Sequence, residues 1–396
     1  MVARPLTLYL IAGEPSGDRL GAALMAGLKT LTEVQFHGVG GPLMQAEGLQ
    51  SQFPMQELSV MGIAEVLPKY FALKRRIAEC AAAVRRLNPE ALVTIDSPDF
   101  CLRVAALVKP QTGTIHYVAP SVWAWRPGRA AKMARVIDQV LALLPFEPPY
   151  MTAAGMGCTF VGHPVAGEPQ ATPAEAKAFR LRHAISPTAP LILALPGSRK
   201  GEIARLAGRF GQTLRLVLER VPTARILIPT LHSTAAFLAD CTRDWPAHIT
   251  LVTSASPADR AEKAAAFAAS DVALAASGTV SLELAASRTP MVIGYDMAWL
   301  SRQIMAALIR TDTVTLVNLV AESRTVPEFL GARCRPEPMA RALTALLAPG
   351  AARQAQLAAM DVTMQRLGQG GEAPGLRAAR AVLATVRTHP LGKLPG

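Results

Sequence analysis

The sequence predicts an α/β protein of two domains, each built on a parallel sheet. Short apolar runs alternate with alanine-rich segments of helical length along most of the 396 residues, the pattern of consecutive βαβ units. This alternation restarts at Leu191, after a stretch (147–190) in which prolines accumulate. The length also exceeds what one hydrophobic core usually organises. We therefore expect one domain over 1–165, a second over 166–345, and helices with a polar tail over 346–396.

The first predicted strand is Leu6 to Ala12, followed by the turn Gly13-Glu14-Pro15-Ser16-Gly17-Asp18 into a helix. Arg4 and the apolar run after it superficially resemble a signal peptide. The run is short and passes directly into the turn without a cleavage site, so a buried strand is predicted instead. The turn lacks the G-x-G-x-x-G spacing of dinucleotide-binding proteins, which disfavours a nicotinamide-dependent dehydrogenase.

After a second strand, Val34 to Val39, the segment 61–76 mixes apolar side chains with Lys69, Lys74, Arg75 and Arg76. Such a segment can lie in a membrane interface. The alternative, an amphipathic helix packed on the sheet, is the commoner situation and is favoured.

Two carboxylates follow the next buried strand, Ala91 to Ile95. Ligands of open α/β sheets bind outside the carboxyl ends of the strands, which is where Asp96 and Asp99 fall. A carboxylate there is suited to act as a general base towards a hydroxyl group. The competing interpretation is that one of them only caps the helix predicted over 101–108.

A strand over Thr114 to Val118 leads into a loop that holds Trp123 and Trp125, two of the four tryptophans. Aromatic and basic residues together are typical of sites for single-stranded nucleic acid, for lipid headgroups or for a phosphorylated acceptor. A solvated basic helix would look the same, and the net charge of +12 does not choose among these readings. Basic residues spaced for one side of a helix follow the tryptophans: Arg126, Arg129, Lys132 and Arg135.

A last apolar run of the first half, Val140 to Phe146, is predicted to be a strand and precedes the proline-rich stretch. The second half then opens with the strand Leu191 to Leu195 and a turn containing Ser198 and Arg199, whose guanidinium suits a phosphate. Two further strands are predicted over Ile226 to Ile228 and Ile249 to Val252.

Residues 272–295 read as a strand, a tight turn, a helix and a second strand. Backbone N–H groups and the helix dipole at the turn Ser277-Gly278-Thr279 suit an anion, and Glu283 suits sugar hydroxyls. Together they indicate a nucleotide or a nucleotide sugar. The alternative is that Ser277 and Thr279 merely cap the helix.

The cysteines and histidines do not indicate a metal site. Five cysteines are widely scattered and seven histidines show no ligand spacing, which points to a reducing compartment and to chemistry without a bound metal or cofactor. No apolar run has the length needed to span a bilayer.

Several motifs taken together resemble the lipid-A-disaccharide synthase family. The match runs from the first strand to about residue 330. The motifs that carry the match are residues 12–18, 97–100, 116–125, 144–147, 161–164, 195–199 and 277–283, together with Thr311-Asp312 and Asn318-Leu319. The resemblance implies a GT-B glycosyltransferase, with two Rossmann-like domains facing across a cleft. It would join UDP-2,3-diacylglucosamine to 2,3-diacylglucosamine 1-phosphate (lipid X), release UDP and use no metal on the diphosphate.

The resemblance also implies roles for the candidate residues. Asp99 would be the catalytic base, with Asp96 as second candidate, and Arg199 would balance charge on the leaving UDP. The donor would contact Ser198, Ser277, Gly278, Thr279, Glu283 and Asn318. The acceptor side would contain Glu14, Ser16, Trp123, Trp125 and Arg126.

Two departures from the family pattern stand out: Glu90 where an aspartate is common, and Val317 in place of a proline before Asn318-Leu319. The resemblance further implies a cytoplasmic protein bound peripherally to the inner surface of the inner membrane, with a homodimer left open. The acceptor motifs disfavour a UDP-N-acetylglucosamine 2-epimerase and the enzyme that glycosylates lipid II. Without a recognisable binding module, a nucleic-acid partner is not expected.

Overall fold

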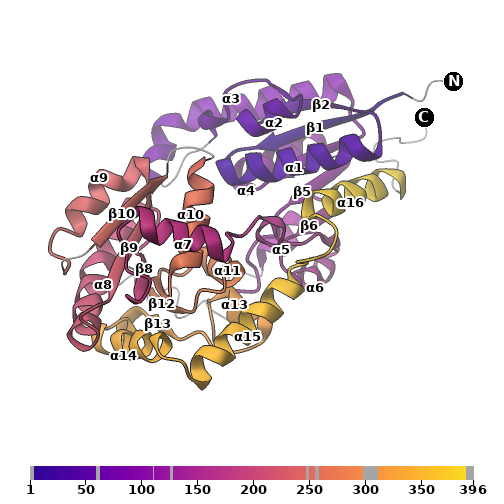
Figure 1. The fold of residues 1–396 in the computed structure, drawn as a ribbon. Coiled ribbons are helices and arrows are strands. Elements are labelled where there is room, and N and C mark those ends of the chain that lie inside the picture. Colours follow the sequence, from indigo (N-terminus) through magenta and orange to yellow (C-terminus); the bar gives the residue numbers. More distant parts are fainter. Residues whose placement is uncertain are drawn as a thin grey trace. The chain divides into compact units, whose positions relative to one another are not determined.

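Two parallel β-sheets organise the chain, one in each of two compact units (Figure 1). The computed structural model describes residues 4–58, 63–109, 111–124, 128–246, 249–254, 258–297 and 311–388. One unit comprises Met1–Gly167 together with Gly370–Gly396, and the other comprises Glu168–Gln369.

The first unit contains a seven-stranded sheet in the order β3-β2-β1-β4-β5-β6-β7, in which every neighbouring pair is parallel. Its strands are β1 (Leu6–Ala12), β2 (Val34–Val39), β3 (Gln50–Ser51), β4 (Ala91–Ile95), β5 (Thr114–Tyr117), β6 (Gln139–Ala142) and β7 (Gly157–Phe160). Its helices are α1 (Pro15–Leu31), α2 (Pro42–Ala46), α3 (Ile63–Leu87), α4 (Pro98–Val108), α5 (Gly128–Met133), α6 (Pro148–Thr152) and α16 (Pro374–Thr388).

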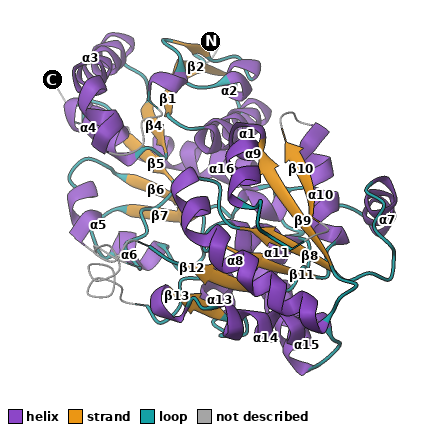
Figure 2. Cartoon of the chain, turned by 90° about the vertical axis from the view of Figure 1, so that its left-hand side faces the viewer, coloured by secondary structure: helices purple, strands orange, loops and turns teal. Residues whose placement is uncertain are grey.

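The second unit contains a six-stranded parallel sheet in the order β10-β9-β8-β11-β12-β13 (Figure 2). Its strands are β8 (Leu191–Leu195), β9 (Arg225–Leu231), β10 (Ile249–Ser254), β11 (Val272–Ala275), β12 (Met291–Tyr295) and β13 (Glu328–Leu330). Its helices are α7 (Pro173–Arg182), α8 (Lys200–Arg220), α9 (His232–Cys241), α10 (Ala258–Ala269), α11 (Val280–Ala286), α13 (Leu316–Ala321), α14 (Pro336–Leu347) and α15 (Ala351–Arg366).

Both faces of the first sheet are buried, which explains why its strands are continuous apolar runs. Along β1, Tyr9 and Ile11 join a core cluster with α3 and α4, whereas Leu8 and Leu10 join a cluster with α1 and α16. The alternation is the period of two that a strand imposes.

The strand order reverses once in each sheet. In the first, β1 lies between β2 and β4, and in the second, β8 lies between β9 and β11. The chain therefore leaves β1 and β4 in opposite directions across the sheet, and likewise β8 and β11. Loops at the carboxyl ends of these strand pairs diverge and leave room for a ligand, so each sheet has one topological switch point.

The last residues of the chain divide between the two units. Helix α14 packs on α8 and α15 packs on α11 and α13, whereas α16 lies alongside α1 in the first unit (Figure 1). The α1–α16 contact is very close, because a Cβ on Gly27 would lie 2.8 Å from the Gly375 carbonyl oxygen.

Some elements differ from the sequence-based expectation. The basic helix is short, since α5 ends at Met133, and Arg135 lies beyond it. The run expected to be a strand through Phe146 is extended only to Ala142 in β6. The edge strands β3, β7 and β13 were not expected. Helix α3 extends to Leu87, well past the predicted end at 76; residues 61 and 62 lie outside the described ranges.

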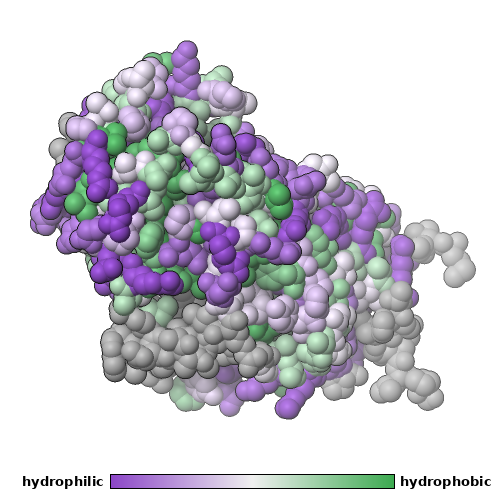
Figure 3. All heavy atoms as spheres, turned by 90° about the horizontal axis from the view of Figure 1, so that it is seen from below, coloured by the Kyte–Doolittle hydropathy of each residue, from purple (hydrophilic) through white to green (hydrophobic). Residues whose placement is uncertain are grey.

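Exposed apolar side chains are dispersed. Hydrophilic and hydrophobic residues are interspersed over the face shown in Figure 3. On α3, however, Tyr70 and Phe71 are exposed side by side, with their rings 5.6 Å apart edge to face. Among the described helices, none combines the length and the hydrophobicity needed to cross a bilayer.

We predict that Gly27→Ala destabilises the first unit, because the new Cβ would press on the backbone of Gly375 and Leu376. Overpacking of this kind outweighs the better helix propensity of alanine, and the free energy of unfolding should fall by about 1–2 kcal/mol. Urea denaturation measures the loss. The matched control is Gly208→Ala on α8, where no atom lies within 4 Å of the new Cβ. That variant should gain up to about 1 kcal/mol; equal effects of the two substitutions would contradict close α1–α16 packing.

Candidate functional site

The loops that follow β1 and β4 are in contact at the switch point of the first sheet. A Cβ on Gly13 would lie 2.4 Å from Ser97 Oγ, and one on Gly17 would lie 3.3 Å from the Ile95 carbonyl oxygen. Only glycine permits so close an approach at position 13. The structure thereby brings the loop carrying Glu14 and Ser16 against the loop carrying Asp96.

The β4–α4 loop has an unusual backbone. Asp96 and Ser97 both adopt positive φ, at 54° and 45°, a conformation that costs non-glycine residues on the order of 1–2 kcal/mol each. The Asp96 carboxylate accepts a hydrogen bond from the Ser97 N–H (2.9 Å) and a longer one from the Ser16 hydroxyl (3.4 Å). Backbone strain held by specific contacts is characteristic of functional loops.

Asp99 lies in the first turn of α4 and is exposed. The N-cap of α4 is Ser97, so neither aspartate occupies the capping position that the alternative interpretation required. Within the described residues, the Asp99 carboxylate makes no hydrogen bond or ion pair, in contrast to that of Asp96. Asp99 is therefore the carboxylate with lone pairs available to an incoming hydroxyl group.

Of the tryptophan loop, the structure describes Trp123. Its ring packs edge to face on Phe146, with centroids 5.3 Å apart, and its buried indole N–H faces the carboxylate of Glu147. Trp125 and Arg126 lie outside the described residues.

Next to Phe146, at the end of the 144–147 motif, Glu147 is a buried acid to which no role was assigned from the sequence. Its carboxylate accepts the Leu144 N–H at 3.0 Å. Burial raises the pKa of Glu147 to about 7, and hydrogen bonds from the Leu144 N–H and the Trp123 indole oppose this rise.

His116, which opens the motif 116–125 that contains the tryptophan loop, belongs to the core of the first unit. Its Nδ1 lies 2.7 Å from the Thr94 hydroxyl, and burial lowers the pKa of the ring to about 4. A neutral, enclosed imidazole at this position supports the sheet.

Glu90, the departure from the family pattern, also has a structural place. Its carboxylate accepts the Thr7 N–H at 2.8 Å, and its own N–H bonds to the Thr7 carbonyl. It therefore fastens the start of β4 to β1.

At the switch point of the second sheet, Arg199 is the N-cap residue of α8 and projects into solvent. It approaches Glu202 at 3.8 Å, a long contact that leaves most of the guanidinium donors available. Gly197 precedes it with φ of +123°, a conformation suited to glycine, and Ser198 is exposed. The Pro-Gly-Ser turn thus presents Arg199 at the carboxyl end of β8.

The Ser277-Gly278-Thr279 turn follows β11, the neighbour of β8. Gly278 has φ of +157° and open space around it. Thr279 is the N-cap residue of α11, but its side chain makes no capping hydrogen bond, and the Ser281 hydroxyl donates to the Gly278 carbonyl at 2.9 Å instead. The side chain of Thr279 therefore does not cap α11, contrary to the alternative interpretation.

Glu283 is paired with a lysine. Its carboxylate makes an ion pair with Lys263 of α10, and both side chains are partly exposed. Lys263 carried no signal in the sequence, because it lies on a different helix 20 residues away.

Asn318 lies in the interior. Its amide donates to Val326 O (3.0 Å) and Thr313 Oγ1 (3.2 Å), and its side-chain oxygen accepts the Val326 N–H (3.0 Å). These bonds use both the nitrogen and the oxygen of the side-chain amide. They hold the segment before α13 against the segment before β13.

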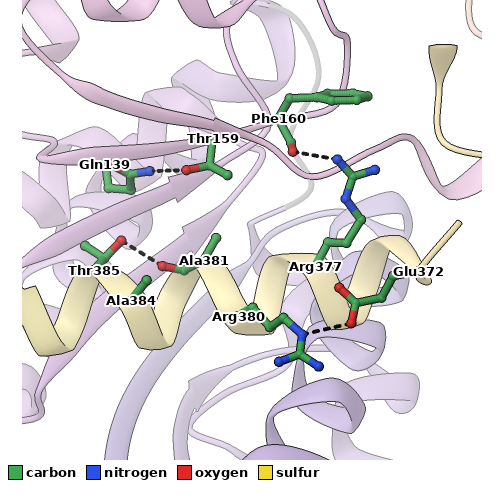
Figure 4. A pocket seen from close by; sticks show the side chains of 9 residues that line it. All are labelled: Gln139, Thr159, Phe160, Glu372, Arg377, Arg380, Ala381, Ala384 and Thr385. Atoms are coloured by element: carbon green, nitrogen blue, oxygen red, sulfur yellow. Dashed lines mark hydrogen bonds and ion pairs between the residues drawn. The ribbon is translucent and has the colours of Figure 1, made fainter.

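A separate pocket of about 570 Å³ lies between α16 and the edge of the first sheet (Figure 4). Its two arginines are engaged within it: Arg377 donates to the Phe160 carbonyl at 3.0 Å and Arg380 pairs with Glu372 at 2.8 Å. None of the predicted site residues lines it. In the part of the chain that is described, no group of three or more His, Cys, Asp or Glu side chains could hold a metal ion.

Comparison with known proteins gives strong matches over nearly the whole chain. The family model described as lipid-A-disaccharide synthetase matches residues 8–374. The lipid-A-disaccharide synthase of Ruegeria pomeroyi is 59% identical over 96% of this chain and 95% of its own length. That of Rhodospirillum centenum is 45% identical over 99% of both chains.

Solved structures share the fold at low sequence identity. The UDP-N-acetylglucosamine 2-epimerase of Rickettsia bellii superposes with a TM-score of 0.63 at 10% identity, covering 97% of this chain and 98% of its own. MurG of Acinetobacter baumannii gives a TM-score of 0.56 at 15% identity, covering 98% and 100%. These two likenesses establish the two-sheet fold.

We predict that Glu147→Gln becomes more stable relative to the wild type as pH rises from about 5.5 to about 8. The raised pKa means that folded wild-type protein keeps a proton that the unfolded chain has released, so wild-type stability falls as pH rises towards 7. The difference across this window should be about 2 kcal/mol. Melting temperatures of both proteins across the window measure it.

The matched control is Glu175→Gln. Hydrogen bonds from the Thr172 N–H and hydroxyl lower the pKa of Glu175. The stabilisation that Glu175 contributes is therefore complete at pH values above the ordinary pKa of glutamate. It is lost only as the pH falls through the lowered pKa of Glu175. The difference between this variant and the wild type should stay flat across the same window; a parallel slope in both variants would contradict the prediction.

Proposed function

The chain belongs to the lipid-A-disaccharide synthase family, and from this premise we propose that the loops at its two switch points bind and activate the two substrates. The protein is a hexosyltransferase of lipid A biosynthesis. It joins UDP-2,3-diacylglucosamine to 2,3-diacylglucosamine 1-phosphate (lipid X) and releases UDP. The observation that carries the site assignment is that motifs from four separate loops fall at the switch points, two in each sheet.

In this proposal the second unit binds the donor. The turn Ser277-Gly278-Thr279 and Ser198 donate hydrogen bonds to the diphosphate, and Arg199 neutralises the charge that develops on the leaving UDP. Its support is the exposure of Arg199 and the open space at Gly278.

Glu283, also in the second unit, binds the ribose hydroxyls of the donor. Its pairing with Lys263 supports this role, because an uncompensated carboxylate beside a diphosphate would repel it. Asn318 contributes by shaping the loop, since its amide is already engaged.

The first unit binds the acceptor and supplies the base. The donor is α-linked and the product is β-linked, so a single displacement with inversion suffices. Asp99 takes the proton of the acceptor 6-hydroxyl as its oxygen bonds to the anomeric carbon and the bond to the UDP oxygen breaks. Asp96, which is engaged by Ser97 and Ser16, orients the loop.

Glu14, Ser16 and the tryptophan loop complete the acceptor side. The first two are on the loop that contacts Ser97, which supports a role in positioning the sugars. Trp123, Trp125 and Arg126 suit an amphipathic phosphorylated acceptor, with aromatic rings for the apolar part and a guanidinium for the phosphate.

The proposal includes peripheral attachment to the cytoplasmic surface of the inner membrane. Both substrates carry acyl chains, and α3 exposes Tyr70 and Phe71 beside the exposed cations Lys74 and Arg75. Aromatic and basic side chains together suit the interface of an anionic bilayer. Arg76 is not part of this surface, because its side chain is mostly covered and pairs closely with Glu57 and Glu79, whereas Arg75 pairs with Glu79 only at 3.5 Å and stays exposed.

We predict that Asp99→Asn and Arg199→Ala each lower kcat for UDP release. Loss of a general base costs about 10²–10⁴-fold, and loss of a charge-neutralising donor costs about 10²–10³-fold. The assay is UDP release from the diacylated donor with lipid X. Arg243→Ala is the control, since Arg243 is an exposed arginine of the same unit paired with Asp240. No turnover by the wild type would refute the activity. Full turnover by Asp99→Asn would move the base elsewhere.

We predict that Phe71→Ser lowers the fraction of protein that floats with phosphatidylglycerol vesicles, because Phe71 is 81% exposed at the centre of the surface. The double substitution Lys74→Glu, Arg75→Glu should do the same and make the remaining binding insensitive to salt. The control is Leu181→Ser on α7, which removes another highly exposed apolar side chain (68% exposed), this one from the second unit. Equal losses in Phe71→Ser and Leu181→Ser would place the attachment elsewhere.

A further inference from the structure

Asp18 is a buried carboxylate in the motif that opens α1, and no role has been assigned to it so far. Its side chain is 3% exposed. Asp18 Oδ1 accepts hydrogen bonds from the N–H groups of Gly41 (2.9 Å) and Met44 (3.0 Å), and Oδ2 accepts one from Leu43 (3.0 Å). A buried carboxylate requires such donors, because its charge has lost the solvation of water.

These bonds cap a helix from outside it. Helix α2 begins at Pro42, and its own N-cap residue, Gly41, has no side chain that could bond the free N–H groups. Asp18 of α1 supplies the acceptor instead, and its negative charge suits the positive end of α2. The β2–α2 loop is thereby fixed to the first turns of α1.

The loop fits closely around the carboxylate. A Cβ on Gly41 would lie 2.5 Å from Asp18 Oδ2, and one on Gly21 would lie 2.5 Å from Met44 Sδ. At Gly41 a side chain would displace the hydrogen-bonded carboxylate, whereas at Gly21 the flexible end of Met44 could shift, so the contact at Gly41 is the one that sets the distance between α1 and the β2–α2 loop.

The same residue is linked to the acceptor loop. The backbone N–H of Asp18 donates to the Glu14 carbonyl at 2.9 Å, the first hydrogen bond of α1. Glu14 and Ser16 are therefore one helical turn or less from the anchored side chain. On the other side, Gly13 and Gly17 press against the end of β4.

We propose that Asp18 is a positioning residue for the acceptor. By fixing the β2–α2 loop to α1, it sets the place of Glu14 and Ser16 relative to the Asp96–Asp99 loop. This inference rests on the proposed function, because it assigns Asp18 to the acceptor-binding loops of the first unit. The donor-binding loops, in the second unit, do not depend on it.

The test is Asp18→Asn. An amide in place of the carboxylate keeps the shape, but it removes the charge and turns an NH2 group towards at least one of the three backbone N–H groups, so the anchor of the β2–α2 loop is weakened. We expect kcat/KM for lipid X to fall about tenfold to a hundredfold, and this fall should come from a higher KM for lipid X and not from a lower kcat. The dissociation constant for UDP, measured by calorimetry, should stay at the wild-type value.

The matched control is Asp138→Asn. Asp138 is also a partly buried carboxylate of the first unit that accepts a backbone N–H, that of Thr114 at 3.0 Å, and it pairs with Lys109. It lies immediately before β6, at the amino end of the sheet, opposite the switch-point loops. This variant should lose thermal stability while its KM for lipid X stays at the wild-type value.

A second variant, Gly41→Ala, displaces the loop while leaving the carboxylate in place. Gly41 has φ of −92°, so alanine meets no backbone strain there and its effect comes from crowding Asp18 Oδ2. It should raise the KM for lipid X in the same way. An unchanged KM in either variant, or an equal rise in Asp138→Asn, would overturn the inference while wild-type turnover still stands. Absence of wild-type turnover would instead refute the proposed function.

Discussion

In each sheet the strand order reverses at one strand, because the chain crosses over to one side of it and later to the other side. The positions of the loops that carry the proposed site depend on this reversal. β1 is flanked by β2 and β4, and β8 is flanked by β9 and β11. The helices that follow must diverge, since parallel crossovers keep one handedness. Loops at that edge are left without a covering helix, so polar groups there stay accessible while the strands beneath them are buried. The proposed chemistry occupies the places that the topology leaves open.

The central strands could be predicted from the sequence, because β1, β4, β8 and β11 are apolar runs that only a doubly covered sheet can bury. The edge strands could not. β7 reads Gly-Cys-Thr-Phe and alternates exposed and partly buried residues, so its apolar content does not distinguish it from a loop. The length of the basic helix α5 was overestimated, because the spacing of its basic residues does not show where the chain must turn. The N–H groups of Val136 and Ile137 bond back to Met133, and the chain then enters β6.

The loops of the candidate site were found from the sequence, but the partners of their side chains were not. Asp96 and Asp99 are three residues apart and look alike in sequence, yet one is held by hydrogen bonds and the other is accessible. The ion pair of Glu283 with Lys263 and the capping of α2 by Asp18 join residues 20 or more apart. Such contacts depend on tertiary packing, which local patterns do not encode. For Asn318, family position suggested a ligand contact, whereas the structure occupies its amide with the backbone.

The return of α16 to the first unit has a consequence for how the protein is made. Residues 168–369 form one uninterrupted unit, whereas the unit that begins at the N-terminus needs Ala378, Ala379 and Val382 to cover one face of its sheet. Domains usually fold in the order in which they are synthesised. Here the second unit is complete on the ribosome while the first still exposes the apolar side of α1. The first unit can therefore complete its core only after α16 has been synthesised, later than the second unit.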